Sequence, residues 1–356
     1  MTLTKQQQQT IDQLHELIDT VDHIVIGKKE TTRLTIAAML AGGHVLFEDI
    51  PGVGKTLLVK TIARLLGIDF SRIQFTPDLI PSDIIGFSVP SAEEHHFVFK
   101  KGPLFSSLLL ADEINRTSPR TQAALLEAMS EGHVTLDDKT HELPDPFFVL
   151  ATQNPIDYEG TYPLPEAQLD RFLMQLSLGY PSPQQEVQML LTEDPQETLT
   201  ELRPLLQLAD FAALKKWANA VYVHPDLATY IVDLGQHTRK DAAIRLGISP
   251  RGNRACLAAA KAYALLEKRD YLLPDDILAV VSVVYRHRLL FYKNLSAEQK
   301  DRSIHQLIQQ SAVPVKRGLK NDALSKKLCS ACCLCRHFIL HHNISQHGFV
   351  VFILFY

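Results

Sequence analysis

The chain has 356 residues, of which 46% are hydrophobic and 21% are charged, and its formal net charge is −4. This composition is typical of a soluble globular protein with two or three domains, and its acidic balance argues against a general nucleic-acid binder. No apolar run is long enough to form a transmembrane segment and the N-terminus has no apolar signal core, so we expect a cytoplasmic protein.

Residues 5–40 have the spacing of two amphipathic helices, with Ile11, Leu14 and Ile18 on one apolar face. The next part of the chain alternates short apolar strands with helices, at 44–48, 57–67, 72–75, 107–111, 119–131, 147–152 and 172–178. This alternation predicts an α/β fold in which helices cover a parallel sheet. Two hairpin-like stretches interrupt it, near 84–99 and 133–143.

The pattern becomes helical from about residue 184, after the prolines at 181 and 183. We therefore expect a first domain over residues 1–182 and an all-α second domain over 183–315. Cys256 lies in this helical part and is expected to be buried. The tail over 316–356 has a different composition, with a formal charge of +5 and four of the five cysteines.

Residues 49–56, Asp-Ile-Pro-Gly-Val-Gly-Lys-Thr, lie between an apolar run and a helical pattern, which is the context of a phosphate-binding P-loop. Gly52 and Gly54 allow the backbone N–H groups to turn toward an anion. Lys55 is expected to reach the β- and γ-phosphates of a nucleotide, and the Thr56 hydroxyl to ligate Mg²⁺. Asp49 departs from the pattern, which has glycine at that position.

Residues 108–113, Leu-Leu-Leu-Ala-Asp-Glu, form an apolar run that ends in two acids. Ligands bind at the carboxyl ends of the strands in a parallel sheet. We therefore expect Asp112 to face the Mg²⁺ shell and Glu113 to polarise a water for attack on the γ-phosphate. The alternative is that both acids only cap the following helix.

Three further polar residues are candidates for the same site. Asn154 follows the strand expected at 147–152 and has the chemistry to hold the attacking water, although it could also simply start a turn. Arg171 precedes a strand and Arg251 opens a helix of the second domain. Arginine stabilises the transition state of phosphoryl transfer, but spacing alone places neither residue at the phosphate and favours a surface or salt-bridged role for both.

Together these motifs resemble the MoxR family of AAA+ ATPases over about residues 10–315. The tail after residue 316 has no counterpart in the family pattern. The segments that match beyond the P-loop are residues 81–86, 102–105, 111–116, 122–129, 151–155 and 159–172.

The resemblance implies an AAA+ core followed by a C-terminal helical lid, with ATP and Mg²⁺ as cofactors. It implies that the two hairpins face the pore or partner side of a ring. The resemblance implies Walker A roles for Lys55 and Thr56 and Walker B roles for Asp112 and Glu113. It also implies that Asn154 is the sensor-one residue, that Arg251 is the sensor-two arginine, and that Arg171 is a finger reaching a neighbour's ATP, with Arg116 as a second trans-acting candidate. The further implied contacts to the nucleotide are from the loop residues Pro51, Gly52, Val53, Gly54 and Leu57, and from Ile26 and Gly27 near the adenine.

The resemblance further implies a homo-hexamer that acts as a chaperone-like remodeller in cofactor insertion or complex maturation, often with a partner carrying a von Willebrand factor A domain. Two alternatives remain at this point. One is an AAA+ nucleic-acid motor or transcriptional regulator, which the acidic balance of residues 1–315 disfavours. The other is a P-loop switch or small-molecule kinase, for which no guanine-reading motif or acceptor pocket can be named.

The tail contains Cys329, Cys332, Cys333 and Cys335, followed by several histidines. These are zinc-type ligands, but the spacing is not that of paired CxxC motifs. A disordered extension, or sequence read in another frame, explains the change in composition more simply.

Overall fold

The computed structural model describes residues 3–50, 52–90, 97–154, 161–192, 195–293 and 295–311. The tail over 316–356, including the zinc hypothesis, lies outside these ranges. Residues up to Val313 form one compact unit. Among the described residues, no helix combines the length and the apolar character that a membrane span requires.

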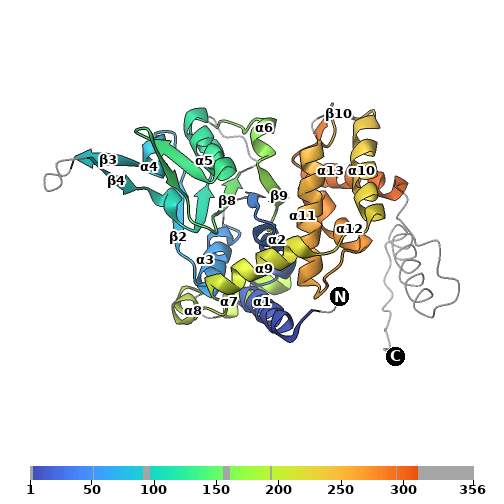
Figure 1. Ribbon diagram of the computed structural model, residues 1–356, viewed down its shortest axis with the longest axis horizontal. Coiled ribbons are helices and arrows are strands. Elements are labelled where there is room, and N and C mark those ends of the chain that lie inside the picture. The colour runs from blue at the N-terminus through green and yellow to red at the C-terminus, as the bar shows by residue number, and fades with distance from the viewer. Residues whose placement is uncertain are drawn as a thin grey trace. The chain divides into compact units, whose positions relative to one another are not determined.

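A five-stranded parallel sheet with the strand order β2–β5–β8–β1–β9 forms the centre of the fold. Its strands β2, β8 and β9 are labelled in Figure 1. The predicted parallel α/β architecture is therefore confirmed. β2 starts two residues earlier than expected. The strands are β1 (His44–Glu48), β2 (Phe70–Gln74), β5 (Leu108–Asp112), β8 (Phe148–Gln153) and β9 (Phe172–Leu176).

The central strands are apolar throughout because both faces of the sheet are covered. In β5, Leu108 and Leu110 belong to one buried cluster, whereas Leu109 and Ala111 belong to a second cluster on the other face. The first cluster continues into the C-terminal helices, where it includes the buried Cys256. One continuous core therefore connects the sheet with those helices.

Helices flank the sheet, and the helix expected at 57–67 begins two residues earlier because Gly54 caps it. The two N-terminal helices pack together and against α11 (Pro250–Leu266) of the C-terminal part. The elements up to β9 are α1 (Lys5–Ile24), α2 (Lys29–Leu40), α3 (Lys55–Leu66), α4 (Pro81–Ile85), α5 (Pro119–Glu131) and α6 (Glu166–Leu169), with short 3₁₀ turns at Pro103–Phe105 and Ile114–Arg116.

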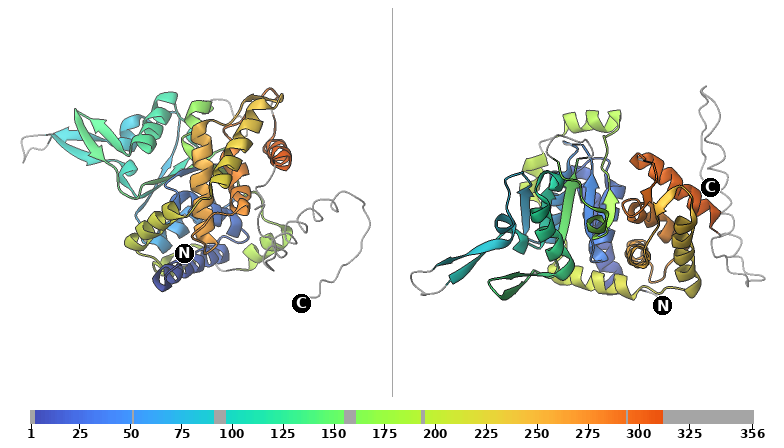
Figure 2. Two further views of the ribbon diagram at one scale, coloured as in Figure 1. Left: turned by 45° about the vertical axis from the view of Figure 1, so that its right-hand side comes forward. Right: turned by 90° about the horizontal axis from the view of Figure 1, so that it is seen from above.

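Both predicted hairpins are present. The first pairs β3 (Gly86–Pro90) with β4 (Phe97–Lys101), and the second pairs β6 (His133–Leu136) with β7 (Lys139–Glu142). Figure 2 shows both hairpins projecting from the sheet on the side away from the helices that follow residue 225. The first carries exposed aromatic side chains, Phe87 and Phe97, which are 48% and 67% exposed.

The C-terminal part is helical, as expected, apart from one small antiparallel pair. Its helix α12 packs against β9, and its α11 packs against α2. The elements are α7 (Pro183–Leu191), α8 (Pro195–Glu201), α9 (Leu208–Ala220), α10 (Pro225–Lys240), β10 (Ile244–Leu246), α11 (Pro250–Leu266), α12 (Pro274–Tyr285), β11 (Leu290–Phe291) and α13 (Ala297–Gln310).

Candidate active site

The loop between β1 and α3 has the backbone shape of a phosphate cradle. Gly52 and Gly54 have φ values of +83° and +92°, which glycine adopts without steric cost. A Cβ on Gly52 would meet no atom within 4 Å, so backbone conformation and not space requires glycine there. Gly54 caps α3, so the positive end of the helix dipole faces the loop. Pro51 lies outside the described residues.

Lys55 is folded back into this loop. Its Nζ donates hydrogen bonds to the carbonyl oxygens of Asp49 at 3.1 Å and Ile50 at 2.8 Å. Burial lowers the pKa of Lys55, while the nearby carboxylates of Asp49, Asp112 and Glu113 act in the opposite direction. Since charge-assisted hydrogen bonds to phosphate are stronger than those to carbonyls, this ammonium is suited to move onto a bound anion.

Opposite the loop, the acids at the end of β5 are connected to β8 through one hydroxyl. Thr152 Oγ1 donates to Asp112 Oδ1 at 2.6 Å and accepts from the backbone N–H of Glu113 at 2.8 Å. Glu113 has φ +57° and ψ +50°, a left-handed conformation that costs about 1–2 kcal/mol for a residue with a Cβ. Such strain clusters at functional sites. Both acids line the cavity.

Two side chains of β2 and one from the turn after β5 hold these carboxylates. Arg72 Nη2 lies 2.6 Å from Asp112 Oδ2, and Gln74 Nε2 donates to Glu113 Oε2 at 2.7 Å. Arg116 Nη1 lies 2.7 Å from the same Glu113 oxygen. Arg72 and Gln74 were not among the site residues that the sequence motifs predict. Their signal is a two-residue spacing, which places both on one face of a strand adjacent to β5.

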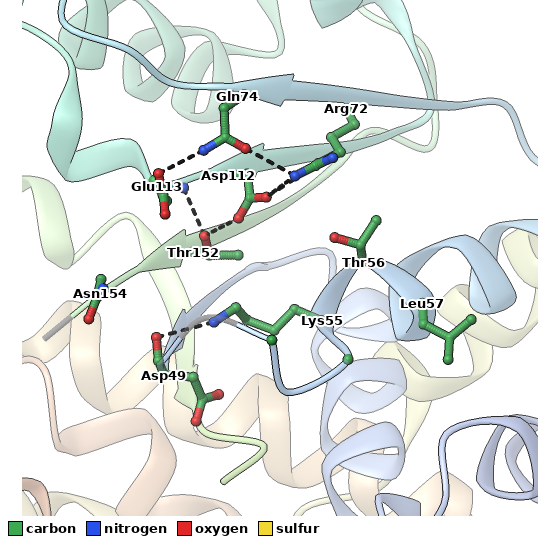
Figure 3. A pocket seen from close by; sticks show the side chains of 12 residues that line it. Asp49, Lys55, Thr56, Leu57, Arg72, Gln74, Asp112, Glu113, Thr152 and Asn154 are labelled. Atoms are coloured by element: carbon green, nitrogen blue, oxygen red, sulfur yellow. Dashed lines mark hydrogen bonds and ion pairs between the residues drawn. The ribbon is translucent and has the colours of Figure 1, made fainter. Parts of the chain in front are cut away.

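These groups surround a cavity of about 400 Å³, within the usual size range of small-molecule sites. Figure 3 shows the two acids and Lys55 on opposite sides of it. The hydroxyl of Thr56 and the carboxylate of Asp112 provide oxygen donors of the kind that Mg²⁺ prefers. The lining residues are Asp49, Gly52, Gly54, Lys55, Thr56, Leu57, Arg72, Gln74, Asp112, Glu113, Thr152 and Asn154.

Asp49 has a role that the P-loop pattern does not predict. Its carboxylate, 6% exposed, accepts hydrogen bonds from Ser177 Oγ at 2.7 Å, Leu178 N at 2.6 Å and Gly179 N at 3.0 Å. Lys28 Nζ donates to the carbonyls of Leu178 and Gly179 at 2.6 and 3.1 Å. Asp49 therefore connects the phosphate loop to the segment that leaves β9.

The residues expected near the adenine lie beside the loop but not in the cavity lining. A Cβ on Gly54 would be 3.7 Å from Val25 Cγ1, which brings the 25–27 stretch next to the P-loop. Ile26 is buried, and the amide of Gln185 on α7 packs against Gly27. Val53 also faces away from the lining, since it packs against the core.

The two candidate arginines, Arg171 and Arg251, lie outside the described cavity lining and are both close to Asp170. Neither Arg171 nor Arg251 is among the described residues that line the cavity. Arg251 Nε lies 3.6 Å from Asp170 Oδ2, and Arg171 is the next residue along the chain. Arg251 is therefore salt-bridged, the alternative that spacing had left open. Asn154, by contrast, does line the cavity, and its carbonyl accepts a hydrogen bond from Asn115.

Comparisons with known proteins agree with this architecture. Residues 44–174 match the model of the ATPase family associated with various cellular activities (AAA), and residues 236–310 match the AAA lid domain. The chain is 46% identical to Uncharacterized protein YeaC of Bacillus subtilis, over 86% of this chain and 96% of that protein. It is 40% identical to Chaperone MoxR1 of Mycobacterium tuberculosis, over 85% and 82%. A crystal structure from Cytophaga hutchinsonii superposes with a TM-score of 0.78 at 36% identity, covering 87% and 97%.

Proposed function

This chain belongs to the MoxR family of AAA+ ATPases, and from that premise we propose that it hydrolyses Mg²⁺-bound ATP in a ring and thereby remodels a protein partner. The observation that carries the proposal is the arrangement across the cavity. A phosphate loop with Lys55 faces Asp112 and Glu113, and Thr152 joins the two acids.

Each group has a distinct task in this proposal. Lys55 and the loop N–H groups bind the β- and γ-phosphates and neutralise their charge. Glu113 accepts a proton from the water that attacks the γ-phosphorus, and the bond to the leaving ADP oxygen breaks. Its backbone is held by the hydrogen bond from its N–H to Thr152, and its carboxylate is held by Gln74 and Arg116. Asn154 orients the water.

Thr56 and Asp112 would hold the metal ion, directly or through water, because both supply hard oxygen donors to one cavity. Bound Mg²⁺ would supply charge neutralisation at the phosphates. Arg72 now occupies one Asp112 oxygen, so its guanidinium shares that carboxylate with the ion or turns away when the ion is bound.

The one arginine among the described lining residues, Arg72, is paired with Asp112, so within a single copy of the chain it is not available to the transition state. We therefore assign Arg171 to the ATP of a neighbouring copy in a ring, with six copies as the working number, and Arg251 to the chain's own nucleotide when the lid moves. Arg116 remains a second trans-acting candidate. The remodelled partner is a protein, with a von Willebrand factor A domain as one candidate class.

The division into a core at 1–182 and a lid at 183–315 is part of this proposal. The AAA match ends at residue 174 and the lid match starts at 236, so both fall within the proposed domains. Helix α12 packs against β9 and helix α11 against α2, so the proposed lid lies against the proposed core.

The test separates binding from turnover. Lys55→Ala should abolish binding of a fluorescent ATP analogue, because it removes the only lysine of the described cavity lining. Glu113→Gln should bind the analogue normally but release phosphate about 100-fold more slowly, the usual scale for loss of a general base.

Matched controls make the same two substitutions at residues outside the cavity lining. Lys60→Ala in α3 and Glu127→Gln on the exposed face of α5 should leave binding and phosphate release unchanged. Undiminished turnover in Glu113→Gln would exclude Glu113 as the base, and normal ATP binding by Lys55→Ala would exclude the loop as the nucleotide site.

A further inference from the structure

The guanidinium of Arg288, three residues after α12, is clamped onto the backbone that carries Arg171. Its side chain is only 4% exposed. Nη2 donates to the carbonyl oxygen of Phe172 at 2.6 Å and of Asp170 at 3.3 Å. Arg288 therefore holds the carbonyls on both sides of Arg171.

Further contacts make this attachment rigid. Arg288 Nη1 donates to the carbonyl of Leu173 at 3.1 Å, and the neighbouring His287 Nε2 lies 3.0 Å from the Phe172 carbonyl. A buried guanidinium requires hydrogen-bond partners for its donors, and here most of those partners come from residues 170–173. The position of the Arg171 backbone is therefore tied to the lid as well as to the sheet.

The carboxylate of Asp170 connects the two lid arginines. Its Oδ1 accepts from Arg288 Nε at 2.6 Å, while its Oδ2 lies 3.6 Å from Arg251 Nε. Arg251 is 63% exposed and can leave, whereas Arg288 is buried and stays. One side chain next to Arg171 thus contacts both a fixed and a movable element of the lid.

We infer that Asp170 and Arg288 are positioning residues that aim Arg171 at the nucleotide of a second copy of this chain. Because Arg251 shares Asp170, movement of Arg251 toward the chain's own nucleotide changes the charge balance beside Arg171. The inference rests on the proposed function and adds to it a connection from the lid of one copy to the active site of the next.

The test is subunit mixing with Asp170→Ala, since a variant of the buried Arg288 could fail to fold. Alone, Asp170→Ala should bind ATP within about two-fold of the wild type but turn over about 100-fold more slowly, the scale of a finger misplaced by about 1 Å. Mixed with an excess of Glu113→Gln subunits, its turnover should recover several-fold. In the mixture, a Glu113→Gln neighbour supplies a correctly positioned Arg171 to the active site of an Asp170→Ala subunit, whose Asp112 and Glu113 are intact.

A defect of folding or of the variant's own pocket would not be rescued in this way. Asp170→Asn, which keeps an acceptor for Arg288, should lose less activity than Asp170→Ala. The matched control is Asp301→Ala, which removes another lid carboxylate, bound by Arg286 Nε at 2.8 Å, and should behave like the wild type.

Mixing Arg171→Ala with Glu113→Gln subunits distinguishes failure of the proposed ring site from failure of the positioning role of Asp170 and Arg288. If that mixture shows no recovery, Arg171 does not act in trans, and the proposed ring site and this inference both fail. If it recovers while the Asp170→Ala mixture does not, the inference alone is wrong. Full activity of Asp170→Ala by itself would also overturn it.

Discussion

The carboxylate of Asp49 should be one of the strongest local contributions to stability in this fold, although it occupies a position where P-loops generally have glycine. We consider its replacement by alanine. The change removes the acceptor of three hydrogen bonds, at 2.6, 2.7 and 3.0 Å, from residues 177–179. It also removes the negative charge that faces the buried ammonium of Lys28.

The magnitude follows from the burial of these groups. Leu178 is 6% exposed, so its N–H would lose its acceptor with little access to water. Water can reach the other two donors more easily, because Ser177 and Gly179 are more exposed. Hydrogen bonds to a charged group contribute about 1.5–3 kcal/mol each. We therefore expect a loss of about 3–5 kcal/mol in the free energy of unfolding.

The assay is denaturant unfolding followed by fluorescence, since the chain has a single tryptophan, Trp217, which packs against the core. Asp49→Asn keeps one acceptor oxygen and should lose about half as much stability as Asp49→Ala. The control is Asp233→Ala on the exposed face of α10, expected to stay within about 0.5 kcal/mol of the wild type.

Asp49→Gly restores the usual P-loop residue and distinguishes the two roles of this position. Asp49 is not among the described residues with positive φ, so its backbone does not need glycine. The glycine variant should be as unstable as the alanine variant. A loss below about 1 kcal/mol in both variants would refute the reasoning from burial and hydrogen bonding.

Two further predictions concern His44 and Thr152. Burial lowers the pKa of His44 from its ordinary value of 6.5 to about 4. Between these two values, His44 is protonated in the unfolded chain but neutral in the folded chain. Its contribution to stability should fall by about 2 kcal/mol from pH 7.5 to pH 5, and a His44→Gln variant whose unfolding free energy keeps the wild-type pH slope would contradict this. Thr152→Val removes the hydroxyl shared by Asp112 and Glu113, and phosphate release should drop about ten-fold with ATP binding retained. The isosteric Thr140→Val on the exposed β7 should have no effect, and equal turnover of both variants would exclude a role for the hydroxyl.

The sequence predicted those features that depend on local pattern. Apolar runs such as 108–111 are buried on both faces of the sheet, and each side of the strand faces a different core cluster. The glycines of the P-loop adopt the positive φ values that their position requires. Lys55, Asp112 and Asn154 meet at one cavity because each follows or ends a parallel strand, and the carboxyl ends of such strands share one edge.

What the sequence by itself determined is therefore the list of strands and helices, their burial and the polar groups at the strand ends. Only the tertiary structure decided which side chains from distant segments contact the polar groups at the strand ends. Arg72 pairs with Asp112 because β2 lies beside β5, Asp49 binds the segment that leaves β9, and Arg251 shares Asp170 with Arg288. These contacts depend on strand order and on how the lid packs, and neither is encoded by the spacing of residues within any one segment.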